Sequence, residues 1–238
     1  MWPLAILTLV CALTYAFEIV FGLGGTVMMI PLLVFWFDAK TLVVYSTLPQ
    51  VAVAAIGLGR SDARVDRRQF LPMLAFAALG FIAGLALFEL LSSRTFQYLL
   101  ASAFLVFGAL LWLPPRGQRL RAPTRAGLDV LAGASQALFG ISGPVAVTRL
   151  LATIGDKTMV RHYALAFFLV LNLARAGGYV ASGAFTHEVL IMMAVSAPVL
   201  LPVLWFAERL HPHVNERWYR RTVALIVVAG GVSLFFRT

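Results

Sequence analysis

The chain has 238 residues, of which 61% are hydrophobic and only 12% are charged. This composition excludes a soluble globular protein, because no globular core needs that much apolar surface, and it predicts an all-α integral membrane protein. The net charge of +9 would suggest a nucleic-acid partner in a soluble domain. Here the arginines lie in short loops between apolar runs, where they set membrane topology, so no nucleic-acid partner is expected.

Apolar runs follow one another along the whole chain. They lie at roughly 3–22, 25–37, 41–59, 70–91, 95–113, 127–141, 144–154, 158–181, 186–207 and 219–236. The runs 25–37 and 144–154 are too short to span a bilayer at ~1.5 Å of rise per residue, and each follows a glycine motif. We therefore expect two hairpins that each enter the membrane and return on the same side. Whether 3–22 makes a full span or half a hairpin stays open from the sequence.

The first glycine motif is Phe21-Gly22-Leu23-Gly24-Gly25, and three glycines in four positions should break a helix. In hydrocarbon a broken helix is tolerated only where protein or a cavity satisfies the freed backbone groups. With a constant offset of 118, the motif aligns with Phe139-Gly140-Ile141-Ser142-Gly143, and eight of 25 ungapped positions are identical. This internal repeat predicts two broken helices that together make one site.

The basic residues of the loops test the hairpin prediction. If both hairpins return to the side they entered from, fourteen arginines and lysines of the loops face one side, which the positive-inside rule names the cytoplasm. The other side receives only Lys40, Arg94 and Arg237. The first half then starts outside and the second inside, which is an inverted-topology repeat. We expect two halves, 1–113 and 127–238, each a broken-helix hairpin plus three transmembrane helices, joined by a cytoplasmic linker at 114–126.

Helices that begin near Gly25 and Pro144 would aim free N–H groups and positive dipole ends at mid-depth, and such helix starts bind anions. The hydroxyls of Thr26 and Ser142 add donors, and glycine lets a ligand approach the backbone closely. The alternative is that these glycines only let helices pack. The candidate substrate-binding residues at the two breaks are Gly22, Gly24, Gly25, Thr26, Gly140, Ser142 and Gly143.

Charged residues inside the apolar runs are further candidates. Arg149, five residues past Pro144, could reach back towards the break or snorkel to the cytoplasmic surface. Arg175 is about 17 residues into its span, so snorkelling at the far end is the favoured interpretation. Glu18 pairs with Gln136 in the repeat; it could carry a coupling proton, because burial disfavours a charged carboxyl, or it could be bonded only for structure.

Polar groups gather in the run 41–59 beside Pro49, which frees the carbonyl one turn back. Gln50 falls near mid-depth, and Ser46 and Thr47 supply hydroxyls on the same turn. We count Ser46 and Gln50 as candidates that line the pathway, although hydroxyls commonly serve only to patch a proline kink.

The sequence contains few features that are typical of an enzyme. It contains no HExxH, CxxC or Gly-x-Ser-x-Gly pattern, and Cys11 is its single cysteine, so a thiolate metal site cannot form. We expect no catalytic residues, no metal and no cofactor.

The chain resembles the sulfite exporter family TauE/SafE. The resemblance rests on the motif FGLGGTVMMIPLL, on its second copy, and on the Ser-Thr pair in the span that follows the first copy. Gly22, Gly24, Gly25 and Pro31-Leu32-Leu33 match that family's pattern, whereas Thr26 replaces a glycine. The second copy departs further, with Ser142 and Pro144 at glycine positions and Arg149 at the position of Pro31. The resemblance implies movement of sulfur-containing anions such as sulfite or sulfonates, often outward across the bacterial inner membrane.

These observations predict a secondary transporter, by resemblance an exporter, of a small anion bound at mid-depth between the two broken helices. An anion channel is one alternative, and a non-transporting membrane subunit of a larger complex is another. The expected partners are the lipid bilayer and the anionic substrate. Protons as the coupling ion and a homodimer remain open.

Overall fold

The computed structural model of the chain describes residues 2–21, 24–59, 65–112, 120–154, 156–209 and 216–236. Within these residues the chain is helical and has no strand. The helices are α1 (Trp2–Phe21), α2 (Gly25–Leu33), α3 (Ala39–Tyr45), α4 (Thr47–Gly59), α5 (Arg67–Leu90), α6 (Ser93–Trp112), α7 (Ala122–Phe139), α8 (Gly143–Leu151), α9 (Lys157–Ala181), α10 (His187–Ala207) and α11 (Glu216–Phe236). The all-α class expected from the composition is confirmed.

Several of these helices are long and apolar enough to cross a membrane. Among the described residues they are Trp2–Val20, Ala39–Gly59, Arg67–Leu90, Thr158–Ala181 and His187–Ala207. Large apolar side chains such as Leu79, Ile82 and Leu90 are exposed on their outer surfaces, as a surface in contact with lipid tails requires. The chain is a multi-pass membrane protein, and α1 is long enough by itself to make a full span.

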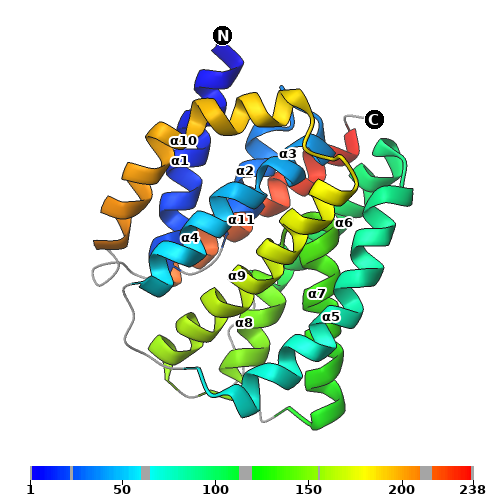
Figure 1. Ribbon diagram of the computed structural model, residues 1–238, viewed down its shortest axis with the longest axis vertical. Helices are drawn as coiled ribbons and strands as arrows, with labels where there is room; N and C mark the ends of the chain where they lie inside the picture. Colours follow the sequence, from blue (N-terminus) through cyan, green and yellow to red (C-terminus); the bar gives the residue numbers. More distant parts are fainter. Residues whose placement is uncertain are drawn as a thin grey trace.

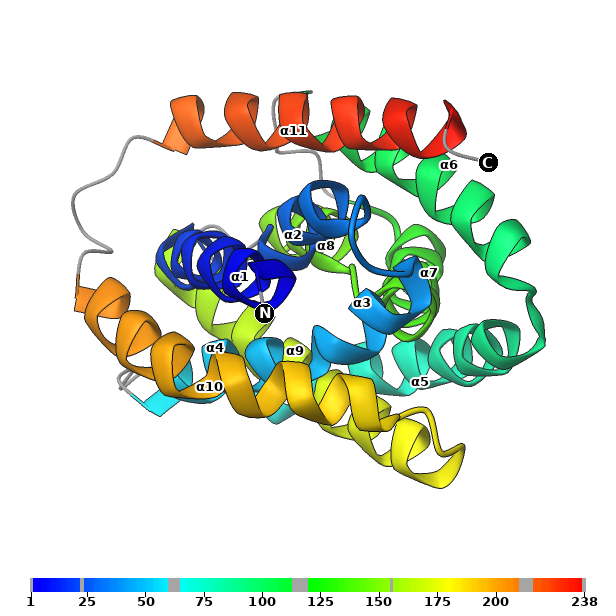
Figure 2. The same ribbon diagram turned by 90° about the horizontal axis from the view of Figure 1, so that it is seen from above.

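The helices form an inner group and an outer ring. Seen from above, α5, α6, α10 and α11 lie at the periphery and surround α2 and α8 (Figure 2). In Figure 1 the short helix α2 lies above the short helix α8, and from above the two overlap, so they are stacked along the long axis of the molecule. The two glycine breaks therefore lie in the interior, between the stacked helices.

The pairs of helices that pack together follow the internal repeat. With the offset of 118, α1 corresponds to α7, α2 to α8, and α3 with α4 to α9. Helix α7 packs along α5 of the first half, and α1 packs along α10 of the second half. Helix α4 packs against α9, and α6 against α11. Each long helix of a hairpin is thus covered by a span of the other half.

The same local signal starts the helix that follows each hairpin. Asp38 is the N-cap of α3 and accepts hydrogen bonds from the N–H groups of Lys40 and Thr41. Asp156, 118 positions later, is the N-cap of α9 and accepts from the N–H of Met159. An aspartate in this position satisfies N–H groups that have no partner within the helix.

The run 41–59 passes through the membrane as α3 and α4, which join at Ser46. Pro49 has no N–H, so the carbonyl of Tyr45 lacks its usual helical donor. The neighbouring bonds are kept, because the N–H of Ser46 donates to Leu42 O and the N–H of Gln50 donates to Ser46 O. The Ser46 hydroxyl donates to Val43 O over 2.7 Å, so the irregular turn is held by its own side chain.

Residues 113–119 of the predicted linker lie outside the described residues. Residues 122–126 at its other end form the start of α7, where Pro123 is tolerated because the first N–H groups of a helix have no helical partner. The division into two halves stays a prediction.

Candidate functional site

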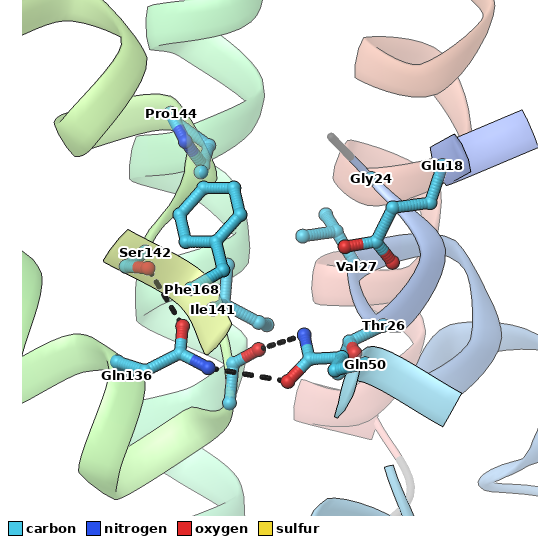
Figure 3. A pocket seen from close by; sticks show the side chains of 12 residues that line it. Glu18, Gly24, Thr26, Val27, Gln50, Gln136, Ile141, Ser142, Pro144 and Phe168 are labelled. Carbon is cyan, nitrogen blue, oxygen red and sulfur yellow. Dashed lines mark hydrogen bonds between the residues drawn. The ribbon is translucent and has the colours of Figure 1, made fainter. Parts of the chain in front are cut away.

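Both glycine motifs line one cavity in the interior of the protein (Figure 3). The first half contributes Glu18 from α1, Gly24, Thr26 and Val27 at the start of α2, and Gln50 from α4. The second half contributes Gln136 and Gly140 at the end of α7, Ile141, Ser142, Gly143 and Pro144 at the start of α8, and Phe168 from α9. The cavity holds about 20 Å³, and one water molecule needs about 10–15 Å³. In this conformation the cavity therefore has room for about one water molecule.

Glycine is required where each helix breaks. Gly24, the N-cap of α2, has φ 108°, and Gly140, which ends α7, has φ 70°. An L-residue with a side chain rarely adopts either conformation. Because of these two turns, the first residues of α2 and of α8 both border the cavity.

The Glu18 carboxyl lies over the start of α2. It faces the backbone N–H groups of Gly25 and Thr26, and its side chain points into the cavity in Figure 3. Glu18 is buried, and its Oε2 has no hydrogen-bond partner among the described residues. A Cβ atom on Gly25 would collide with that oxygen and with the ring of Tyr15. Gly25 thus lets the carboxyl approach the helix start.

The opposite wall is a network of amide side chains. Gln50 Nε2 donates to Gly140 O over 2.7 Å, and Gln136 Nε2 donates to Gln50 Oε1 over 3.1 Å. Ser142 Oγ donates to Gln136 Oε1 over 2.6 Å, and Gln136 Nε2 also donates to Asn172 Oδ1 over 2.8 Å. The network ties α4, α7, α8 and α9 together at the second break.

Arg175 lies directly behind this wall and is 0% exposed. Its guanidinium donates to Ser46 Oγ over 3.0 Å, to Gln50 Oε1 over 2.9 Å and to Gln136 O over 3.2 Å. The expectation that Arg175 snorkels to the surface was wrong. Acceptors from Ser46, α4 and α7 lie within reach of both Nη atoms at depth, whereas Nε has no hydrogen-bond partner among the described residues.

The structure brings most of the predicted site residues together. Gly24, Thr26, Gln50, Gly140, Ser142 and Gly143 line the cavity with Glu18, and Gly25 lies beneath the Glu18 carboxyl. Ser46 does not line it but holds Arg175. Gly22 lies outside the described residues.

Arg149 lies away from the cavity. Its Nε pairs with Asp129 Oδ1 over 2.9 Å, and both side chains are nearly buried. Its Nη1 also donates to Thr153 over 3.5 Å. The guanidinium is therefore held between α7 and the end of α8, and it borders a different cavity, with Arg68 and Arg125.

Sequence reasoning gave no site role to Gln136, Asn172, Arg175 or Phe168. Two signals could have found part of this set. Gln136 aligns with Glu18 in the repeat, and Arg175 is an ionisable residue inside a membrane span, which is a functional candidate by default. Asn172 lies three residues before Arg175 and so shares its helix face. Nothing in the sequence singled out Phe168.

The arrangement suits a small anion. N–H groups lie at the start of α2 (Gly25 and Thr26) and at the start of α8 (Gly143). The hydroxyls of Thr26 and Ser142, now bonded to Tyr15 and Gln136, line the cavity, and Arg175 supplies a positive charge behind the wall. A single carboxyl, Glu18, faces the same space. Protonation of that carboxyl would leave a net positive charge around the cavity.

The sequence of the chain matches a known protein family. The family model described as sulfite exporter TauE/SafE matches residues 7–234, nearly the whole chain. No curated protein and no solved structure matches this chain. The match covers both glycine motifs and the helices that carry Glu18 and Arg175. On this match the chain belongs to the sulfite exporter TauE/SafE family and is a membrane transporter of the sulfite-exporter type.

Proposed function

We propose that this protein transports a small sulfur oxyanion, such as sulfite or an organosulfonate, and binds it in the cavity between the two glycine breaks. The observation that carries the proposal is that the starts of α2 and α8, one from each copy of the motif, border one buried polar cavity. The choice of sulfur oxyanions rests on membership of the family. We place the protein in the bacterial inner membrane on the same basis.

Recognition would use donors that come from several directions. An oxyanion with three oxygens accepts hydrogen bonds from backbone N–H groups at helix starts, where the helix dipole also favours negative charge. The Ser142 hydroxyl, now bonded to Gln136 Oε1, can turn towards a ligand. Arg175 holds the side-chain amide of Gln50 and the backbone carbonyl of Gln136 in place and adds a long-range attraction.

Glu18 would couple the anion to a proton. When ionised, its carboxylate occupies the N–H groups of Gly25 and Thr26 that an anion would use, and it repels a second negative charge. When protonated, it removes that repulsion and can donate a hydrogen bond. Proton and anion would therefore bind together and move in the same direction.

Transport needs the cavity to open to each side in turn. Helix α7 packs along α5, and α1 packs along α10, so each half contacts the other in the same way. This packing supports an inverted repeat in which one half can rock against the other. A cavity of about 20 Å³ has room for about one water molecule, so it would have to widen to hold an anion. The hairpins α1–α2 and α7–α8 would be the parts that separate.

Flux measurements on proteoliposomes test the proposal. Uptake of radiolabelled sulfite should be inhibited by excess methanesulfonate and much less by acetate. Preloading with unlabelled sulfite should accelerate uptake, as a carrier requires and a channel does not. A matched control is Gly25→Val, whose side chain would fill the space under Glu18. Sulfite flux no greater than that of empty liposomes, or equal inhibition by acetate, would contradict the proposal.

A further inference from the structure

A second cavity, of about 370 Å³, opens between α5, α7 and α8. It shares no lining residue with the cavity at the glycine breaks. Three arginines line it: Arg68 from α5, Arg125 from α7 and Arg149 from α8. These residues are far apart in the sequence, so the charge cluster is produced by the packing of the helices.

The charges of this cavity do not cancel. Asp129 is the carboxylate among its lining residues, and its Oδ1 pairs with Arg149 Nε over 2.9 Å. Three guanidinium groups against one carboxylate leave two positive charges. The Nε of Arg125 is buried and has no hydrogen-bond partner among the described residues, whereas Arg68 is exposed. Among the described lining residues, the cavity therefore has a net positive charge that attracts an anionic group.

The cavity changes from basic to apolar along α5. Arg68, Pro72 and Phe76 line it at intervals of four residues, which places them on one face of the helix. Eight residues of helix correspond to about 12 Å, so the lining runs from the arginines at the helix start into the apolar span. Phe76 is 41% exposed, as expected for a side chain that faces a lipid tail.

We propose that this cavity binds an acidic phospholipid of the cytoplasmic leaflet. The headgroup phosphate would lie among Arg68, Arg125 and Arg149, and an acyl chain would follow Pro72 and Phe76. Guanidinium groups suit phosphate oxygens, and basic pockets between membrane helices on the cytoplasmic side commonly hold acidic headgroups. A free phosphate would use only the charged end, whereas a phospholipid matches both ends.

Native mass spectrometry of the purified full-length protein tests this site. The protein is titrated with dioleoyl-phosphatidylglycerol or dioleoyl-phosphatidylcholine. Wild-type protein should bind the first lipid about tenfold more tightly, and Arg68→Gln combined with Arg125→Gln should remove most of that preference. Arg94→Gln removes an exposed arginine beside the opposite end of α5 and should keep it. Equal effects of the double variant and of Arg94→Gln would overturn the proposal.

A second pair of measurements separates a lipid from a free anion. Phe76→Ala keeps every charge of the cavity but shortens its apolar end, so it should weaken phosphatidylglycerol binding several-fold. Inorganic phosphate should raise the melting temperature less than the lipid does, and equally in wild type and Phe76→Ala. If inorganic phosphate protects as well as phosphatidylglycerol, or if Phe76→Ala binds the lipid like wild type, the lipid assignment is wrong.

Discussion

Two buried residues of opposite charge, Glu18 and Arg175, act on the central cavity in different ways. Arg175 is tied by three hydrogen bonds to α4 and α7, so its position is set by the protein. Glu18 has a carboxyl oxygen without a hydrogen-bond partner among the described residues, so its environment can change when a ligand or a proton arrives. The fixed cation suits a structural and electrostatic role, and the under-bonded carboxyl suits a coupling role.

Glu18→Gln should make transport independent of pH. In the wild type, transport of methanesulfonate should rise as pH falls, because protonation of Glu18 removes a negative charge from the cavity. Glutamine resembles the protonated acid, so the variant should keep about the low-pH rate at every pH. Methanesulfonate is the substrate to use in this measurement, because its own charge does not change near neutral pH. Glu89→Gln, at an exposed position of α5, should keep the wild-type profile; an unchanged profile in Glu18→Gln removes Glu18 from coupling.

Gly140→Ala should destabilise the protein more than Gly183→Ala. Both glycines have φ 70°, and alanine in that conformation costs about 1–2 kcal/mol. A Cβ at Gly183 meets nothing, whereas one at Gly140 collides with the Arg175 guanidinium. Moving that buried group breaks charge-assisted hydrogen bonds worth about 1.5–3 kcal/mol each. Thermal unfolding of the two variants measures the difference, and equal stability would show that Arg175 can shift freely.

At the scale of elements, the close pairing of α5 with α7 positions the second half of the cavity. A Cβ at Gly80 would collide with the carbonyl of Val130, and one at Gly133 with the carbonyl of Ala77. The two backbones are therefore nearly in contact, as small residues allow in membrane proteins. Helix α7 carries Gln136 and Gly140 at its far end, so its placement against α5 determines where they lie.

Gly133→Ala should lower the melting temperature, and Gly127→Ala on the same helix should not. At Gly133 the added Cβ would collide with the backbone of α5, so the two helices must separate. This should lower the free energy of unfolding by about 1–3 kcal/mol. At Gly127 the added Cβ meets nothing, and alanine favours the helix by up to about 1 kcal/mol. Circular dichroism melting in the same detergent compares the two variants. Equal destabilisation by both would show that helix contact is not the cause.

At the scale of the whole molecule, contacts between distant residues show which loops lie at the same end of the protein. The N–H of Asp66 donates to Tyr163 over 2.8 Å, and Arg161 pairs with Glu208 over 2.7 Å. The segments rich in basic residues around 66, 161 and 208 thus lie near one another. Lys40 donates to Phe88 O over 2.8 Å, so it lies with the end of α5 that precedes Arg94.

Reporter fusions should place residue 120 and the C-terminus on opposite sides of the membrane. The inverted repeat puts both Met1 and Thr238 outside the cytoplasm and residue 120 inside, because fourteen basic loop residues then face the cytoplasm. Paired alkaline phosphatase and green fluorescent protein fusions report the two sides. If the fusions at 120 and at the C-terminus report the same side, the second hairpin crosses the membrane and the inverted repeat is wrong.

The sequence alone determined the membrane class, the two helix breaks and the family. Each of these depends on local information: composition decides whether a helix is stable in lipid, and closely spaced glycines lower the stability of a helix. The offset of 118 also paired the two breaks, and Glu18 with Gln136, from the order of the residues. These predictions needed no knowledge of how the helices pack.

Only the tertiary structure decided which cation lies behind the cavity wall. By distance along the chain, Arg149 is close to a glycine break and Arg175 is near the end of its span, yet Arg175 lies behind the cavity wall and Arg149 lines a different cavity. Asp129, from α7, holds Arg149 away, and acceptors from α4 and α7 hold Arg175 in the interior. A buried charge goes where other helices supply partners, and those partners are set by packing between segments that are distant in the sequence.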